Sequence, residues 1–335
     1  MATTADFKRF CEAELAPSLT VLDVRRRKIM WIAVGCGGAL AVFVSLMVFT
    51  PTGASMPLIP LSFVTALILG IVGTLKWWGF RHDYKEEVLA QIVKYVDPGL
   101  KYRAQGKVDR NKFEAGKLFK HSIDRYSGED HVRGTLGVTE FEFSELHVEY
   151  ESRSTNSDGK DTSRWKTIFK GLYFVADFHK HFQSDVVVLP DRLERTLGFI
   201  GKALQSMNPT RDDLIRLEDP EFEREFVVYG TDQIEARYIL TPGMMQRMLE
   251  LKRKVDGPTH FAFTGSEVHV AVSISKNHFE PKLFTSCLEF DDLCAYVDDL
   301  RLVTGIVEDL NLNTRIWSKA PELPPASGPE KVGVG

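Results

Sequence analysis

The sequence predicts an α+β protein with a hairpin of two transmembrane helices near its N-terminus, followed by a cytoplasmic globular region of antiparallel sheet plus helices. Three observations lead to this fold class. Residues 29–75 contain no Asp, Glu, Lys, Arg or His, strand-like alternation begins near Phe113, and apolar positions recur at helical spacing near the C-terminus. With 335 residues, 44% of them hydrophobic and 26% charged, the chain can bury at least one sizeable core.

Two uncharged runs are long enough to cross a bilayer. Residues 29–50 and 56–75 comprise 22 and 20 residues, and a helix rises about 1.5 Å per residue through a hydrocarbon core of about 30 Å. Residues 51–55 would form an uncharged external turn between them. A signal peptide has a shorter apolar core of roughly 7 to 15 residues, so we expect two spans and no cleavage. A buried hairpin of a soluble protein is the alternative.

Basic flanks predict the orientation of the hairpin. The cluster Arg25–Lys28 precedes the first span, and Lys76, Arg81 and Lys85 follow the second. By the positive-inside rule both ends face the cytoplasm. We therefore expect a multi-pass protein of the cell inner (cytoplasmic) membrane, with the lipid bilayer as a partner and with cytoplasmic N- and C-termini. Because neither span carries an ionisable residue, the hairpin is an anchor rather than a transporter.

The segments beside the membrane have helical patterns. Residues 1–28 form a cytoplasmic amphipathic segment whose helical spacing ends at Pro17, and residues 76–112 form a juxtamembrane helical stalk that stops at Asp97-Pro98-Gly99. Residues 320–335 are rich in Pro and Gly, which predicts a disordered tail.

The globular region contains two successive stretches of strands and helices. Residues 113–208 form an expected α+β sub-domain, in which antiparallel strands are closed by a helix that begins after Pro190. A pleckstrin-homology-like partial barrel has the same order of elements. Apolar positions change phase along residues 138–152, which predicts a bulge or tight turn near Ser144. Residues 209–319 repeat the theme, and the sequence leaves open whether the two stretches form one domain or two.

Three long stretches of the soluble part are distinctive. They are IFKGLYFVADFHKHF (residues 168–182), LEDPEFEREFVVYGTDQIEARYILTP (residues 217–242) and GIVEDLNLNTRIWSK (residues 305–319). The chain resembles, over roughly residues 84–319, a bacterial membrane-protein family catalogued as domain of unknown function 3137. This resemblance implies bacterial origin and membrane anchoring, and it brings no activity, catalytic residue or cofactor. It also suggests a LemA-type membrane protein as a partner, because family members are often encoded beside such proteins.

The candidate metal ligands are Asp177, His179 and His181. They alternate along one expected strand, so the three side chains would share a face and could reach one ion. Glu145 and Glu151 begin and end a similar alternating row on an earlier strand. If the two strands were neighbours, a His/carboxylate cluster would result. The alternative is that each row is the solvated face of a half-buried strand.

The candidate partner-binding patch comprises Asp219, Glu221, Phe222 and Tyr229. An acidic rim around aromatic side chains suits a basic or cationic partner. Alternatively, the acids cap and solubilise elements whose aromatic side chains face the core.

Charge and motifs narrow the function. A formal net charge of −4 argues against nucleic acid as a partner. No Walker loop, nucleophile elbow or dinucleotide fingerprint occurs. We therefore expect a non-enzymatic, membrane-anchored interaction or scaffold module that needs no cofactor and binds a membrane or cytoplasmic protein. Two alternatives stay open: a membrane-associated metal-dependent hydrolase that uses the His/carboxylate cluster, and a module that binds lipid head groups.

Overall fold

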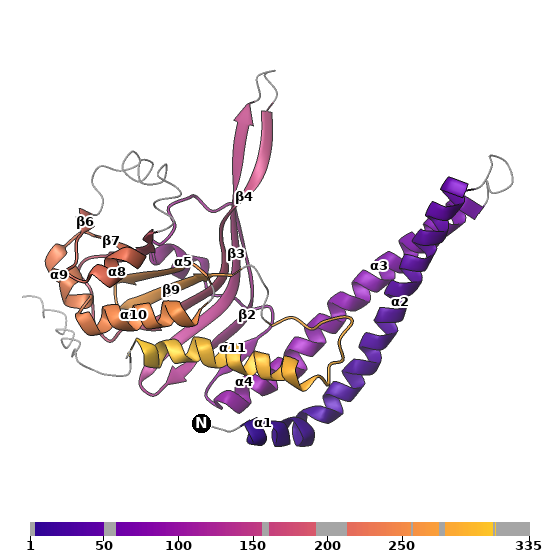
Figure 1. The fold of residues 1–335 in the computed structure, drawn as a ribbon, viewed down its shortest axis with the longest axis horizontal. Coiled ribbons are helices and arrows are strands. Elements are labelled where there is room, and N and C mark those ends of the chain that lie inside the picture. Colours follow the sequence, from indigo (N-terminus) through magenta and orange to yellow (C-terminus); the bar gives the residue numbers. More distant parts are fainter. Residues whose placement is uncertain are drawn as a thin grey trace, which may run out of the picture.

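The computed structural model is an α+β protein with an N-terminal pair of apolar helices and one antiparallel sheet (Figure 1). The helix pair projects from one side of the sheet domain, and a two-stranded arm of the sheet also extends beyond the domain. The structure describes residues 4–49, 58–155, 161–191, 213–255, 257–274, 279–310 and 312.

Each member of the pair is one continuous helix with an internal π-helical turn. The first consists of α1 (Thr4–Phe10), η1 (Cys11–Leu15) and α2 (Ala16–Phe49), and the second of α3 (Leu58–Tyr84), η2 (Lys85–Leu89) and α4 (Ala90–Val96). Both contain a stretch that is long and apolar enough to cross a membrane, and only 6% of each stretch is buried. At the other end of each helix, apolar side chains such as Leu15, Leu19, Val88 and Ile92 are buried in the main core.

The sequence pattern predicts that the first helix ends at Pro17, but the helix continues through this residue. The π-helical turn of η1 precedes this proline, and the Ala16 N–H donates to the Cys11 carbonyl five residues back. The wider turn departs from the regular hydrogen-bond ladder where proline supplies no N–H, so the helix continues. The second helix ends where expected, since α4 stops at Val96 and Asp97 adopts an extended conformation.

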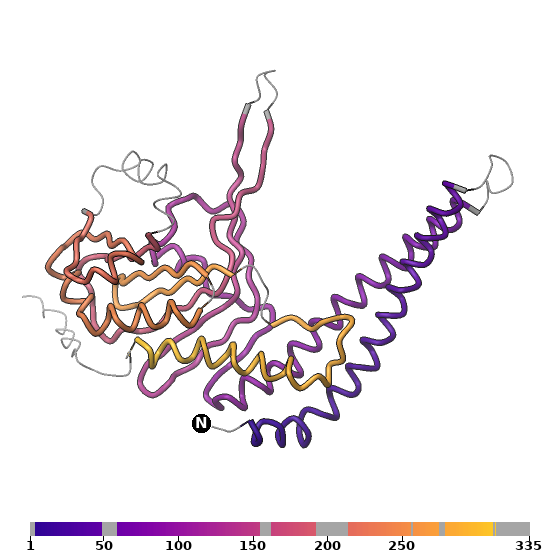
Figure 2. Tube along the Cα trace, viewed as in Figure 1, coloured from indigo at the N-terminus to yellow at the C-terminus, as the bar shows by residue number. Residues whose placement is uncertain are grey.

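The sheet has nine strands in the order β1-β2-β3-β4-β9-β8-β5-β7-β6, and every neighbouring pair is antiparallel. The strands are β1 (Lys101–Arg103), β2 (Arg125–Leu136), β3 (Thr139–Thr155), β4 (Asp161–Asp177), β5 (Val186–Pro190), β6 (Asp213–Ile215), β7 (Phe226–Gly230), β8 (Thr259–Thr264) and β9 (Glu267–Ser273). Because β5 lies between β8 and β7, one sheet joins the two expected sub-domains. The projecting arm consists of the far ends of β3 and β4 (Figure 2).

The phase change along β3 reflects a core on both faces of the sheet. Phe141 and Phe143 belong to the larger buried cluster, whereas Leu146 and Val148 belong to a second cluster on the other face. The strand therefore alternates without interruption while its apolar side changes. A register shift does occur opposite Ser144, but the extra residue lies in β2, between Glu129 and Val132.

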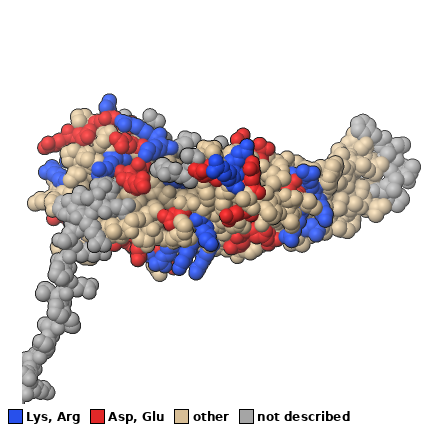
Figure 3. Space-filling view, turned by 90° about the horizontal axis from the view of Figure 1, so that it is seen from below, with Lys and Arg blue, Asp and Glu red and all other residues tan. Residues whose placement is uncertain are grey.

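Helices of 6 to 20 residues cover the sheet. They are α5 (Arg110–Ala115), α8 (Pro220–Glu225), α9 (Gln233–Ile239), α10 (Pro242–Lys254) and α11 (Phe290–Asp309). Side chains of α10 and α11 belong to the larger cluster, and Phe113 of α5 belongs to the second. The expected helix after Pro190 and the expected tail lie outside the described residues. Seen from below, charged side chains of both signs are interspersed over the sheet domain, and the far part of the helix pair shows none (Figure 3).

Candidate functional site

The three predicted metal ligands do not lie on one strand. β4 ends at Asp177, and His179 adopts a left-handed conformation with φ of +57°. Asp177 accepts the His179 backbone N–H at 3.0 Å, and its carboxylate lies 3.1 Å from His179 Nδ1. His181 instead lies 3.2 Å from the Ser266 hydroxyl. The expected alternation through His181 is therefore wrong, because a side-chain-capped turn ends the strand after Asp177.

The second expected row does not join the first, although its strand is a neighbour. Glu145 lies opposite Leu172, and Phe141 lies opposite Ala176, the residue before Asp177. The offset of five residues along an antiparallel strand separates Glu145 from Asp177 by about 17 Å. The two rows therefore do not form one His/carboxylate cluster.

The acidic and aromatic patch is divided between capping, ion pairing and the core. Asp219 caps α8 by accepting the N–H groups of Glu221 and Phe222 at 2.9 and 3.1 Å. Glu221 pairs with Arg253 on α10. Phe222 is fully buried in the core, and Tyr229 is half-buried on β7. Of the four, Glu221 is thus the side chain most open to a partner.

A different charged cluster lies where the second helix meets the sheet. The Lys85 side chain is 4% exposed, and its Nζ lies 2.7 Å from Asp130, 2.9 Å from Glu129 and 2.7 Å from Glu280. Arg81, one turn earlier on α3, also pairs with Glu280. This junction cluster therefore ties the helix pair both to β2 and to the segment before α11.

The bulge in β2 positions the most buried acid of the junction cluster. Asp130 has φ of +59°, it is 1% exposed, and it accepts the Tyr102 hydroxyl at 2.5 Å. Its left-handed backbone directs the carboxylate toward Lys85 rather than along the regular alternation of the strand. The bulge in β2 opposite Ser144 thus places a buried carboxylate beside Lys85.

Burial and an excess of acid decide protonation in this cluster. Lys85 would lose charge through burial alone, but Asp130 and Glu280 outweigh this effect and raise its pKa. Burial raises the pKa of Asp130 to about 7, against the opposing effect of Lys85. The two directions are compatible because several acids surround one lysine: Asp130 and Glu280 stabilise the charged form of Lys85, whereas burial and the nearby Glu145 favour the neutral form of Asp130.

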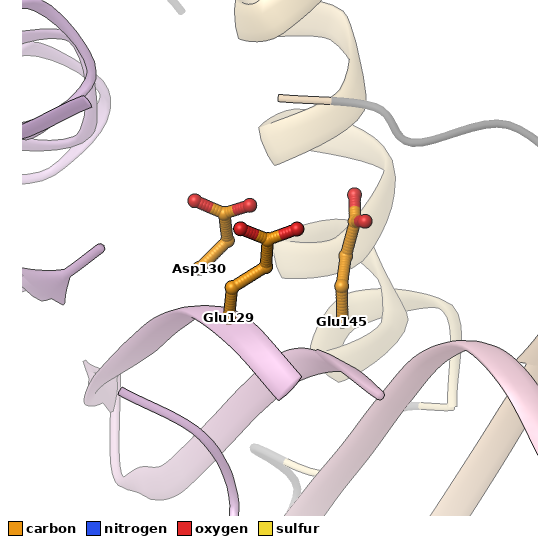
Figure 4. Close-up of side chains that lie close together, drawn as sticks. All are labelled: Glu129, Asp130 and Glu145. Carbon is orange, nitrogen blue, oxygen red and sulfur yellow. The ribbon is translucent and has the colours of Figure 1, made fainter. Parts of the chain in front are cut away.

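Glu129, Asp130 and Glu145 also form the one group of at least three potential metal ligands within the described part of the chain (Figure 4). One carboxylate oxygen of each residue lies within 4.8 Å of the other two, and the three side chains extend to the same side of the sheet. The Lys85 ammonium, however, already contacts two of the three acids. A cation of this chain thus provides the positive charge that a metal ion would otherwise supply.

A second buried cluster ties the first helix to the same segment. Asp23 is 3% exposed and pairs with Arg26 at 2.9 Å. It also accepts the Cys287 N–H and the Ser286 hydroxyl, both at 3.0 Å. Although burial opposes ionisation, hydrogen bonds from Arg26, Cys287 and Ser286 lower the pKa of Asp23 to about 2. Asp23 and Arg26 therefore form a buried ion pair that attaches the first helix to the segment before α11.

Both junction clusters escaped the sequence-based prediction, which assigned Lys85 and Arg26 only to the basic flanks of the spans. The sequence contained one signal that pointed to the second cluster. Arg26 lies on the same helical stripe as Leu15, Leu19 and Leu22, all of which are buried. A charge on a buried stripe predicts a buried partner, but local spacing does not identify that partner.

Comparisons with known proteins give one structural and one family match. The crystal structure of the mycobacterial trehalose monomycolate transport factor A is similar with a TM-score of 0.32 and 11% identity, over 66% of this chain and 96% of that one. No curated protein matches the chain. Residues 167–312 match the family described as protein of unknown function, domain of unknown function 3137, which confirms the predicted resemblance over that segment.

Proposed function

We propose that the chain is a membrane-anchored interaction module. The two apolar helices span the inner membrane, both termini face the cytoplasm, and the sheet domain presents a protein-binding surface at a fixed place beside the bilayer. The domain has no enzymatic role in this proposal. A membrane or cytoplasmic protein is the partner, and a LemA-type membrane protein is one candidate.

One observation carries the proposal: each apolar helix continues without a break into the core of the sheet domain. Leu22 precedes the apolar stretch of the first helix and is 1% exposed, and Ile92 follows that of the second and is 0% exposed. Buried ion pairs of Asp23 and Lys85 then fix both helices to the domain. A flexible tether would need none of these contacts, so the geometry favours a function that depends on the position of the domain.

The two alternatives have less support. A metal-dependent hydrolase would need Asp177, His179 and His181 at one ion, and His181 hydrogen-bonds elsewhere. A lipid-head-group module of the pleckstrin-homology type would need a barrel with a basic mouth. The described strands form a single nine-stranded sheet with interspersed charges.

The test is site-specific photo-crosslinking of the full-length protein in its native membrane. A photoreactive phenylalanine replaces exposed Glu221 near the sheet edge formed by β6 and β7. The matched control carries the same group at exposed Lys101 on β1, the opposite edge strand. We expect a defined partner to be captured from position 221 and not from position 101, as identified by mass spectrometry.

Capture of the same proteins from both positions, or of none from either, would contradict an interaction site at this edge. Alkaline carbonate extraction tests the anchoring separately, because an integral membrane protein stays in the pellet. Stoichiometric metal in the purified protein that is lost on His179→Ala would instead favour the hydrolase.

A further inference from the structure

The segment between β9 and α11 crosses both helices where their apolar stretches end. We call residues 279–289 the strap. On the second helix, Glu280 of the strap pairs with Lys85 at 2.7 Å. On the first, the Leu283 carbonyl accepts a hydrogen bond from Arg26 Nη1 at 2.7 Å. The strap is therefore held to both helices of the pair.

Further hydrogen bonds hold the strap to the first helix. Cys287 donates its N–H to Asp23, which lies three residues before Arg26 on the same helix. Arg26 Nε bonds the same Asp23 oxygen at 2.9 Å, so one Asp23–Arg26 pair on the first helix holds both Leu283 and Cys287. We call residues 283–285, which begin at the first of these anchor points and lead to Ser286, the apex of the strap; Figure 2 shows the strap as a loop beside the two helices.

An aromatic side chain stands unprotected at this apex. Phe284 is 73% exposed, among the most exposed large hydrophobic side chains of the described residues. It follows the residue bonded to Arg26, and Arg26 lies only three positions before Ile29, where the uncharged run begins. Phe284 therefore lies at the level where the first helix would enter the bilayer.

The surroundings of Phe284 match the chemistry of a membrane interface. Arg25, Arg27 and Lys28 are exposed at the same level of the first helix, where Arg25 also pairs with Asp83 at 2.9 Å and Arg27 with Asp23 at 2.8 Å. Basic side chains at this depth suit anionic head groups, and aromatic rings prefer the boundary between head groups and acyl chains. If Phe284 stayed in water, its apolar surface would remain solvated, and the protein would lose the favourable free energy of removing that surface from water.

We propose that Phe284 inserts into the interfacial region of the bilayer that the helix pair spans, which makes the strap a third membrane contact. This inference rests on the proposed membrane anchoring. The strap then fixes the tilt of the sheet domain as well as its attachment, because two helices and an off-axis loop contact the membrane at separate points.

The test is fluorescence quenching by brominated lipid in the full chain. The chain contains five tryptophans, and a background is prepared in which all of them are replaced by phenylalanine. Three versions carry one tryptophan each: native Trp31 restored, Phe284→Trp and Ile234→Trp. Each is placed in nanodiscs of phosphatidylcholine and phosphatidylglycerol, with or without acyl chains brominated near the glycerol end.

Trp31 lies just inside the first apolar run and reports on the spans, whereas Ile234 is 81% exposed on α9 and serves as the matched control. We expect Phe284→Trp to lose intensity about as strongly as Trp31 and to emit at shorter wavelength than Ile234→Trp. If Trp31 is quenched but position 284 is not, the strap proposal fails and the anchoring stands.

If Trp31 itself is not quenched, the anchoring proposal fails, and the strap proposal with it. A blue-shifted but unquenched tryptophan at position 284 would mean that protein, such as a second copy of the chain, covers the apex, which also overturns the inference. Quenching of Ile234→Trp equal to that at position 284 would show that the strap is not distinguished from the rest of the surface.

Discussion

Replacement of Lys85 by methionine tests whether the junction cluster holds the helix pair to the sheet. Methionine keeps the length and apolar stem of the side chain and removes the ammonium. It leaves Asp130, which is 1% exposed, without its partner at 2.7 Å, and it also removes the contacts to Glu129 and Glu280. Removal of one partner from a buried ion pair typically destabilises a protein by about 3–5 kcal/mol.

The expected shift follows from the size of the domain. For domains of a few hundred residues, 1 kcal/mol corresponds to about 2–4 °C in melting temperature, so Lys85→Met should lower it by about 6–20 °C. The cost should be smaller at pH 6 than at pH 8. Burial raises the pKa of Asp130 to about 7 although Lys85 lowers it, so loss of Lys85 raises this pKa further. Asp130 of the variant then takes up a proton in place of the lost ammonium, whereas in the native protein it is ionised and paired at pH 8.

The measurement is thermal unfolding of the full chain in detergent, followed by tryptophan fluorescence at both pH values. Lys254→Met is the matched control, because Lys254 makes a surface pair with Asp309 at 2.6 Å and its side chain is 51% exposed. Such pairs contribute about 0–1 kcal/mol. The reasoning is refuted if Lys85→Met costs no more than Lys254→Met, or if its cost does not depend on pH.

Three further perturbations have defined outcomes. Because burial raises the pKa of Asp130 from 3.8 to about 7, the stabilisation that Asp130 contributes is complete below pH 4 and is lost as the pH rises through 7. In Asp130→Asn the melting temperature should therefore depend less on pH between pH 5 and 8. An unchanged pH profile would contradict this. Asp23 has the opposite sign: its pKa is lowered to about 2, so its contribution is present above pH 4 and is lost as the pH falls through 2. Asp23→Asn should cost about 1.5–3 kcal/mol at pH 7 in chemical unfolding and much less near pH 2, and an equal cost at both pH values would refute the role of its charge. Gly171 has φ of +150°, and an added Cβ would lie 2.0 Å from the Val272 carbonyl oxygen. Gly171→Ala should therefore destabilise the folded protein by at least about 2 kcal/mol. Gly243→Ala is the control and should not, because its Cβ would meet nothing within 4 Å.

The sequence alone determined the elements that depend on local pattern. The uncharged run of residues 29–75 and its basic flanks predict the apolar helix pair, and Asp97-Pro98 marks the end of α4. Alternation predicts the β3–β4 hairpin and strand β9. These predictions succeed because burial on one side of an element imposes a period that is visible over a few residues.

Only the tertiary structure decided which distant residues meet. Lys85 and Asp130 are 45 positions apart, and Arg26 and Leu283 are 257 apart. The periodicity of a helix states that a side chain is buried, but not what it is buried against. For the same reason the phase change along β3 was visible in the sequence, but only the structure showed that it reflects a second core on the other face rather than a bulge in the strand itself.

The predicted alternation from Asp177 through His181 was wrong for a related physical reason. Alternation from Asp177 to His181 is compatible with a strand, but the chain has another local solution, in which the Asp177 carboxylate caps the His179 N–H and the strand ends. Which solution wins depends on what surrounds the turn: Thr139 lies 3.2 Å from His179 Nε2, and the Phe178 N–H donates to the Ser266 carbonyl at 2.8 Å. Those contacts come from segments about 40 and 90 residues away, which pack against the turn only in the folded chain.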